Sequence, residues 1–202
     1  MPVLEIVVAT PSELYRKEGT KAVEEASKII TQVEGHIFSY TGDGIQDPHQ
    51  FFIAVAWNRH EDHIALMNDK QTYSAFGTAL FKNISEIHLL HHAKLDDPYP
   101  ALDSPVTEIV LYTLHPEADR EKFVELVTEL YDRASNLDGA AKGGHGPFIE
   151  DERKWVLILG FQSVEEFQRI AAVDPKVGQL IGQLKEFADA TMTLVPFHKY
   201  LQ

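Results

Sequence analysis

The chain of 202 residues contains no cysteine. That absence excludes disulfide bonds, thiolate catalysis and cysteine-ligated zinc, and it is compatible with a reducing compartment. No apolar run approaches the roughly 18 residues that a membrane-spanning helix needs. The first ten residues, MPVLEIVVAT, also lack the basic start of a signal peptide. We therefore expect a cytoplasmic protein without a membrane partner.

Positive charge is scarce as well. Lysine and arginine number 18 against 31 aspartates and glutamates, so the formal net charge is -13 at pH 7. Such a charge repels the phosphates of nucleic acids and anionic lipid surfaces, and we expect no nucleic-acid partner. Hydrophobic residues, in contrast, make up 44% of the chain. They are enough to bury the core of one large domain or of two domains of about 100 residues each.

A long internal repeat favours two domains over one. PVLEIVVAT, at residues 2–10, recurs as PVTEIVLYT at residues 105–113. Each copy continues with a helical pattern (residues 19–33 and 118–137), two strands around a turn-rich segment, and a second helical stretch. The copies close on the strands EIHLLHHAKL and MTLVPFHKYL. Each copy is therefore predicted to have the β-α-β-β-α-β order of a ferredoxin-like unit.

The repeat predicts the domain boundaries. We expect a first unit at residues 1–95, a linker at 96–105 with three prolines and three aspartates, and a second unit at 106–202. In the first strand, alternation puts Leu4, Ile6 and Val8 on one face, which we expect to meet the helices. The other face carries Glu5 among apolar residues and also needs cover. Two units packed sheet to sheet as a pseudo-dimeric α+β barrel, with a cavity between them, would provide it. A further homodimer is compatible with this arrangement.

Several short motifs carry a resemblance to a known family. They are VLEIVV and VTEIVL at the strand-one starts, FFIAVAWNRHEDH, QTYSAF and HHAKL. With these motifs the chain resembles the antibiotic-biosynthesis-monooxygenase (ABM) family of the dimeric α+β barrel superfamily, particularly its fungal-type members. The resemblance implies a fused pseudo-dimer. It also implies a choice among cofactor-free oxygenation of aromatic polyketides, haem degradation and aldol cyclisation.

The haem-degrading branch can be compared residue by residue. Its pattern has an Asn in strand one and a Trp and a His in helix two. Those positions hold Glu5, Leu66 and Phe76 here, and the second copy holds Glu108, Ile170 and Leu180. Because no axial ligand is present in either copy, we expect no haem. The resemblance to cofactor-independent members of the family implies that no other cofactor is needed.

The cyclase branch points to candidate catalytic residues. It uses a His in helix two that an Asp near the end of strand four orients. Tyr73 stands at the position of that His, and His91 or His92 at the position of the Asp. A tyrosine–histidine pair can still pass protons, so we predict Tyr73 and His92 as catalytic, with Glu5 or His63 as an alternative base. Glu5 is either a cavity carboxylate with a raised pKa or a strand-edge glutamate facing water.

Trp57 and several neighbours are candidates for contacting the substrate. Trp57 either stacks on a planar substrate or plugs the end of the barrel. His60 and His63, three residues apart at a helix start, align with the apolar Val164 and Phe167 of the second copy and should point inward. They are either site residues or core histidines, and their spacing alone is weak evidence for zinc. The remaining candidates for substrate contact are His88, Phe76 and Phe38.

The last strand of the first copy contains three histidines. Alternation predicts His88 and His92 on one face and His91, a packing residue, on the other. In the alignment of the copies, only His92 recurs, as His198. If only one copy retains a site, we expect it to be the first, because seven of the ten histidines lie before the linker.

Three functional hypotheses remain open. The first is a small-molecule enzyme of ABM type that oxygenates or cyclises an aromatic, polyketide-like substrate without a cofactor, by proton abstraction in an apolar cavity. The second is a non-catalytic barrel that binds a small ligand or contributes to stress tolerance. The third is a metal enzyme that uses His88 and His92, with or without His63. The first hypothesis requires no metal.

Overall fold

The computed structural model describes residues 2–200, so residues 1, 201 and 202 at the ends of the two predicted repeats lie outside the described residues. The chain divides into two compact units. The first unit holds the described residues up to Lys94 and those from Phe197 on, and the second unit holds Leu95–Pro196. None of the described helices is long and apolar enough to cross a membrane.

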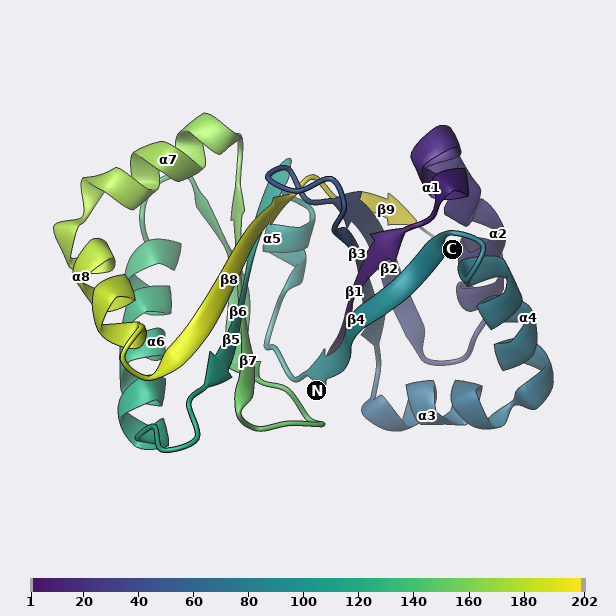
Figure 1. The fold of residues 1–202 in the computed structure, drawn as a ribbon, viewed down its shortest axis with the longest axis horizontal. Coiled ribbons are helices and arrows are strands. Elements are labelled where there is room, and N and C mark those ends of the chain that lie inside the picture. The colour runs from purple at the N-terminus through teal and green to yellow at the C-terminus, as the bar shows by residue number, and fades with distance from the viewer. Residues whose placement is uncertain (1, 201–202) are drawn as a thin grey trace. The chain divides into compact units, whose positions relative to one another are not determined.

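The first unit is a five-stranded antiparallel sheet with helices against it (Figure 1). The strand order is β4-β1-β3-β2-β9. Its strands are β1 (Val3–Pro11), β2 (His36–Asp43), β3 (Phe51–Trp57), β4 (Ile84–Ala93) and β9 (His198–Tyr200). Its helices are α1 (Glu13–Glu18), the 3-10 helix η1 (Gly19–Val23), α2 (Glu24–Ile30), α3 (His60–Asn68) and α4 (Lys70–Leu80).

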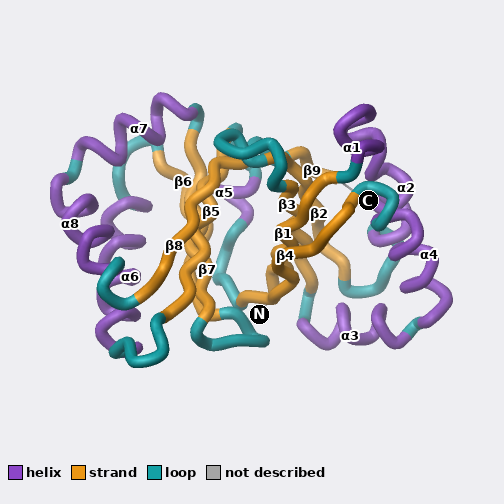
Figure 2. The backbone as a smooth tube through the Cα atoms, in the orientation of Figure 1, coloured by secondary structure: helices purple, strands orange, loops and turns teal. Residues whose placement is uncertain are grey.

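The second unit is a four-stranded antiparallel sheet with the order β6-β7-β5-β8. Its strands are β5 (Val106–Leu114), β6 (Ala140–Pro147), β7 (Lys154–Phe161) and β8 (Ala188–Val195). Its helices are α5 (Tyr99–Leu102), α6 (Arg120–Ser135), α7 (Val164–Val173) and α8 (Pro175–Leu184). Figure 2 shows α6, α7 and α8 together on one side of this sheet.

The predicted fold class is confirmed. Each unit runs β-α-β-β-α-β, and in each sheet the first and third strands of the unit are central, as the ferredoxin-like order requires. Helix α6 shows why the helices pack on the sheet. Its buried residues recur at steps of three and four, so that one apolar stripe faces the strands: Phe123, Leu126, Val127, Leu130 and Ala134.

The predicted orientation of strand one was wrong. Val7 and Ala9, rather than Leu4 and Ile6, belong to the buried cluster that contains the helix residues Ile30 and Leu66. Glu5 shares their face and therefore points toward the helices. Alternation identifies the two faces of a strand but not which of them meets the helices, because both faces here are apolar.

The histidines of β4 lie on other faces than predicted, for the same reason and because of a β-bulge. His92 pairs with Glu5 and shares its helix-facing side, while His91 pairs with Ile6 on the opposite face. The register shifts between Val8 and Ala9, and His88 falls in that shift. A bulge breaks the alternation of faces, so the predicted common face of His88 and His92 does not follow.

The chain also divides differently from the predicted boundaries. Residues 96–105, expected as a linker, contain helix α5 and belong with Leu95 to the second unit. The last predicted strand breaks at Pro196, which has no N–H for the ladder. Beyond this break β9 pairs with β2 of the first unit, where the Tyr200 hydroxyl donates to the Thr20 carbonyl at 3.0 Å.

The predicted helix over residues 19–33 is interrupted in the structure. Helix α1 begins earlier, at Glu13, and ends at Glu18, because the following Gly19 has a φ of 62° that is incompatible with a continuing α-helix. The chain then passes through η1 before α2 ends at Ile30. The second predicted helix, over residues 118–137, corresponds to the uninterrupted α6.

Candidate functional site

Each unit places one glutamate in the middle of its sheet, on the helix-facing side. Glu5 lies on β1 and pairs with Val55 of β3, and Glu108 lies on β5 and pairs with Leu159 of β7. These positions correspond in the two repeats. The surroundings of the two carboxylates differ completely, and this difference defines two candidate sites.

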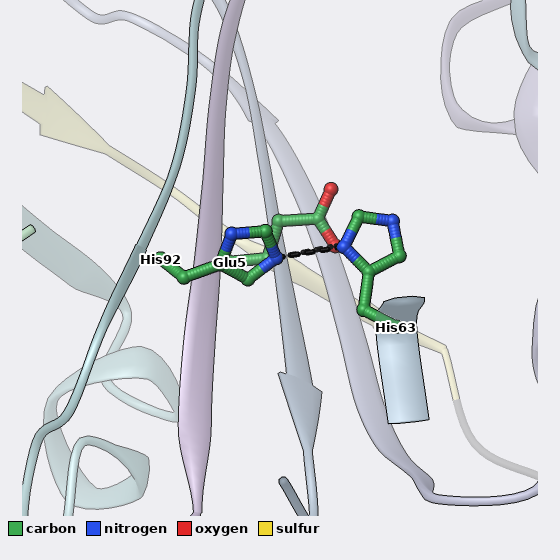
Figure 3. Close-up of side chains that lie close together, drawn as sticks. All are labelled: Glu5, His63 and His92. Carbon is green, nitrogen blue, oxygen red and sulfur yellow. Dashed lines mark hydrogen bonds and ion pairs between the residues drawn. The ribbon is translucent and has the colours of Figure 1, made fainter. Parts of the chain in front are cut away.

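In the first unit Glu5 meets two histidines from different elements (Figure 3). His63 comes from the first turns of α3, and His92 from β4 directly beside Glu5. A hydrogen bond of 2.7 Å joins His63 Nδ1 and His92 Nε2. The Glu5 Oε2 atom lies 3.6 Å from the first nitrogen and 3.8 Å from the second. The three residues are between 3% and 6% exposed, so the cluster is almost sealed from solvent.

Trp57 completes the wall of this cluster. Its indole N–H donates to Glu5 Oε2 at 2.8 Å, and its ring stacks on His63 with 5.1 Å between ring centroids. His60 packs edge-on against His92 at 4.7 Å. The structure thus brings together five of the residues singled out from the sequence, and Trp57 acts both as a hydrogen-bond donor and as a packing surface.

The other predicted site residues lie elsewhere. Tyr73 is on α4 with 38% of its surface exposed, whereas its predicted partner His92 is 3% exposed. His88 is exposed and hydrogen-bonded to the Thr10 hydroxyl at 2.7 Å. Phe76 packs against the apolar core of the first unit. Phe38 pairs with Ala56 and so lies on the face of the sheet opposite to Glu5, where Lys199 Nζ is 4.2 Å from its ring centroid.

The second unit has apolar residues at the positions of the histidines. Phe161 takes the place of Trp57 and Phe167 that of His63, and their rings lie 5.3 Å apart. Leu194 pairs with Glu108 as His92 pairs with Glu5, which corrects the predicted correspondence of His92 with His198.

A cavity of about 290 Å³ lies in the second unit, between its sheet and its helices. Its lining is apolar apart from Glu108, Tyr112 and Lys185. The apolar residues come from every helix on this face and from three strands: Val110, Leu130, Ala134, Leu157, Leu159, Phe161, Phe167, Ile170, Val177, Ile181, Leu184, Ala188, Ala190 and Met192. Ile181 and Met192 are 44% and 42% exposed, so the cavity opens between α8 and the edge strand β8.

Glu108 has no counterpart to the polar neighbours of Glu5. Among the described residues, no hydrogen bond or ion pair stabilises its carboxylate. Burial in apolar surroundings therefore raises the pKa of Glu108 from 4.5 to about 7. Burial, and then the nearby charge of Glu108, raise the pKa of the Tyr112 hydroxyl, which stays protonated. A carboxyl group with a pKa near neutrality can act as a base or an acid.

The sequence contained a signal for this second site that its histidine content obscured. Glu108 occupies in the second repeat the position of Glu5 in the first, but the concentration of histidines favoured a site in the first copy. Histidines are polar neighbours, and they fill space and stabilise charge. In the second unit Phe167 and Leu194 take their places, so Glu108 lies beside an apolar cavity and not beside imidazoles.

Several solved structures resemble the whole chain, among them the following three. A presumed monooxygenase from Fusobacterium nucleatum subsp. nucleatum has a TM-score of 0.72 at 13% identity, with 100% of this chain and 98% of that chain covered. A presumed monooxygenase from Lactobacillus acidophilus NCFM has a TM-score of 0.67 at 15% identity, with 100% of this chain and 96% of that chain covered. An anthrone oxidase-like protein has a TM-score of 0.69 at 12% identity, with 98% of this chain and 92% of that chain covered. The likeness shows a shared tandem fold.

No protein-family model matches the chain, and no curated protein matches its sequence significantly. The two presumed monooxygenases come from bacteria, so they give no support to the fungal-type part of the resemblance.

Proposed function

We propose that the chain is a small-molecule enzyme of ABM type that binds an aromatic, polyketide-like substrate in the cavity of the second unit, where Glu108 removes a proton from it. The observation that carries the proposal is a single carboxylate on the wall of a largely apolar cavity. The tandem fold shared with the presumed monooxygenases and the anthrone oxidase-like protein is consistent with it.

The cavity limits the size and polarity of the substrate. Ligand sites for drug-sized molecules span roughly 300 to 1,000 Å³, so a cavity of about 290 Å³ suits a compact molecule of one to three rings. Its apolar lining favours an uncharged aromatic skeleton. Glu108 and Tyr112 provide the two polar points inside, and Lys185 provides a positive charge at the exposed end.

Glu108 and Tyr112 have complementary properties for the reaction. With a pKa of about 7, Glu108 is ionised in a large fraction of molecules at neutral pH and can still accept a proton readily. Tyr112 remains protonated and can donate a hydrogen bond to the oxygen of a developing enolate or phenolate.

Oxygenation needs no cofactor when the substrate itself supplies the electrons that reduce O₂. For an anthrone-like methylene, loss of a proton to Glu108 gives an electron-rich anion that reacts with O₂. One oxygen atom becomes the new carbonyl, the other leaves as water, and the methylene carbon supplies the electrons. The protein then contributes a base, orientation and a dry site.

The sequence also predicted a first-unit reaction with Tyr73 and His92 passing protons. That pairing stays a prediction, and the exposure of Tyr73 favours Glu108 as the base. Substitution of each residue separately distinguishes the two sites.

The test is oxygen uptake with a panel of anthrones and phenolic polyketides. We expect wild-type turnover of at least one compound and a loss of at least about 100-fold in kcat for Glu108→Gln, because general-base catalysis typically contributes 10²–10⁴-fold. Glu121→Gln, an exposed carboxylate on α6, is the matched control and should keep full activity. Full turnover by Glu108→Gln would remove Glu108 from the mechanism.

A non-catalytic ligand-binding protein is the second candidate, because the same cavity would hold a ligand without any reaction. Wild-type protein that binds these compounds, measured by Trp155 fluorescence or calorimetry, but consumes no oxygen and forms no product would support this candidate instead.

A further inference from the structure

The cluster of Glu5, His63 and His92 in the first unit is unused by the proposed function. We propose that these three side chains form a binding site for one divalent transition-metal ion of the zinc or iron(II) type. The inference is independent of the cavity in the second unit, which has no histidine at the corresponding positions.

The donor atoms are of the required kind and number. Two imidazole nitrogens and one carboxylate oxygen are a donor set that Zn²⁺ and non-haem Fe²⁺ take in proteins, with further coordination positions left open. Each comes from a different element, namely β1, α3 and β4, so the fold rather than a local sequence motif brings them together. The three donor atoms lie within 4.8 Å of one another.

Their spacing matches one ion. Separations of 2.7, 3.6 and 3.8 Å place His63 Nδ1, His92 Nε2 and Glu5 Oε2 about 2.0 Å from a common centre. Bonds from Zn²⁺ to imidazole nitrogen and carboxylate oxygen are about 2.0–2.2 Å long. Only the two histidine nitrogens are closer together than metal ligands normally are. A cation would take the place of the proton they share and separate them slightly.

The fold does not need these histidines. The second unit has Phe167 and Leu194 at the same positions and forms the same β-α-β-β-α-β unit around them. The first unit instead buries two imidazoles and a carboxylate that are 3–6% exposed, an arrangement that is costly unless the groups are well paired. A ligand that holds all three groups together explains why they share one buried point.

The surroundings are those of a metal site. The Trp57 indole N–H donates to Glu5 Oε2 and so orients the carboxylate, as a hydrogen bond from outside the ligand set commonly does. The Trp57 ring stacked on His63 holds the imidazole plane. His60, which is only partly buried, packs edge-on against the His92 ring.

The experiment is Zn²⁺ titration by calorimetry of full-length, tag-free protein after treatment with a chelator. We expect one ion per chain with a Kd at or below the micromolar range. At hundredfold excess over the Kd, the Tm should rise by about 5 °C or more. His63→Phe and His92→Leu place the second unit's own residues at these positions and should fold. We expect each of them, and Glu5→Gln, to weaken binding by more than about 100-fold.

Two control variants separate this site from the rest of the chain. Glu108→Gln removes the corresponding glutamate of the second unit, and His91→Thr removes the neighbouring histidine on the opposite face of the sheet. Both should bind Zn²⁺ as the wild type does. Wild type that binds no ion stoichiometrically would overturn the proposal, as would ligand variants that bind as tightly as the wild type. Both results leave the Glu108 proposal untouched.

A second measurement uses only wild-type protein, in case a ligand variant fails to fold. Co²⁺ bound by two imidazoles should shift the ring N–H signals of two histidines strongly in the proton NMR spectrum. Its visible absorption should also have the intensity of a four- or five-coordinate ion. A spectrum with no shifted histidine signals would exclude the assignment.

Discussion

Glu108 gives a prediction about stability that needs no knowledge of the substrate. The pKa of this carboxyl is about 7 in the folded chain and near 4.5 in the unfolded chain. Below pH 4.5 both states are protonated and Glu108 has no effect on the free energy of unfolding. Between pH 4.5 and 7 the unfolded chain has released the proton while the folded chain retains it. Stability therefore falls as the pH rises, and the loss is complete above pH 7.

The magnitude follows from the same two values. A pKa difference of this size corresponds to about 3 kcal/mol between the protonated and ionised forms. Part of the loss has already occurred at pH 5, and water that enters the cavity screens the charge. We therefore expect the wild type to lose about 2 kcal/mol through Glu108 between pH 5 and pH 8.5. Glu108→Gln removes this loss because glutamine does not ionise.

The assay is urea unfolding of wild type and Glu108→Gln at a series of pH values. Fluorescence suits it because Trp155 lies in the core of the second unit and Trp57 in that of the first. Every other titrating group contributes equally to both proteins, so the difference between their curves isolates Glu108. Glu121→Gln should follow the wild type to within about 0.5 kcal/mol. Parallel curves for wild type and Glu108→Gln would refute the raised pKa and, with it, the reason for a base at neutral pH.

Three further predictions concern the second unit. Ala134→Phe places a ring in the cavity, and we expect aromatic ligands to bind at least about 10-fold more weakly, by calorimetry, while the Tm stays within a few degrees. Gly160→Ala would put a Cβ 2.3 Å from Ser104 Oγ and 2.7 Å from Ala101 Cα, so it should lower the free energy of urea unfolding by about 1–3 kcal/mol. Gly178→Ala, inside α8 with open space around the new Cβ, should raise it by about 0.5–1 kcal/mol in the same assay.

The contrast between the two strand-one glutamates shows how little a residue type says about its chemistry. Glu5 accepts a hydrogen bond from Trp57 and lies beside two imidazoles. Glu108 has neither, and its pKa is raised accordingly. Two copies of one sequence pattern thus support a proposed metal site in one unit and a proposed acid–base site in the other.

The order of elements could be read from the sequence. The recurrence of PVLEIVVAT as PVTEIVLYT and the apolar periodicities between the repeats sufficed for two ferredoxin-like units, because strands and helices differ in the period at which side chains return to one face. The same alignment placed Trp57 with Phe161 and His63 with Phe167, as the structure does. Glu5, His63 and His92 were all selected as chemically important from the sequence.

Tertiary structure alone decided which faces those residues share. Both faces of β1 are apolar, so alternation could not say that Glu5 turns toward the helices. The bulge at His88 shifts the alternation of side-chain faces along β4 by one residue. Which residues share a point depends on register and on the packing of α3, and neither is encoded in local periodicity. The cavity beside Glu108 is the space left between packed side chains from three strands and three helices. A sequence pattern identifies which residues are apolar, and only their packing in three dimensions determines whether they fill that space or leave it open.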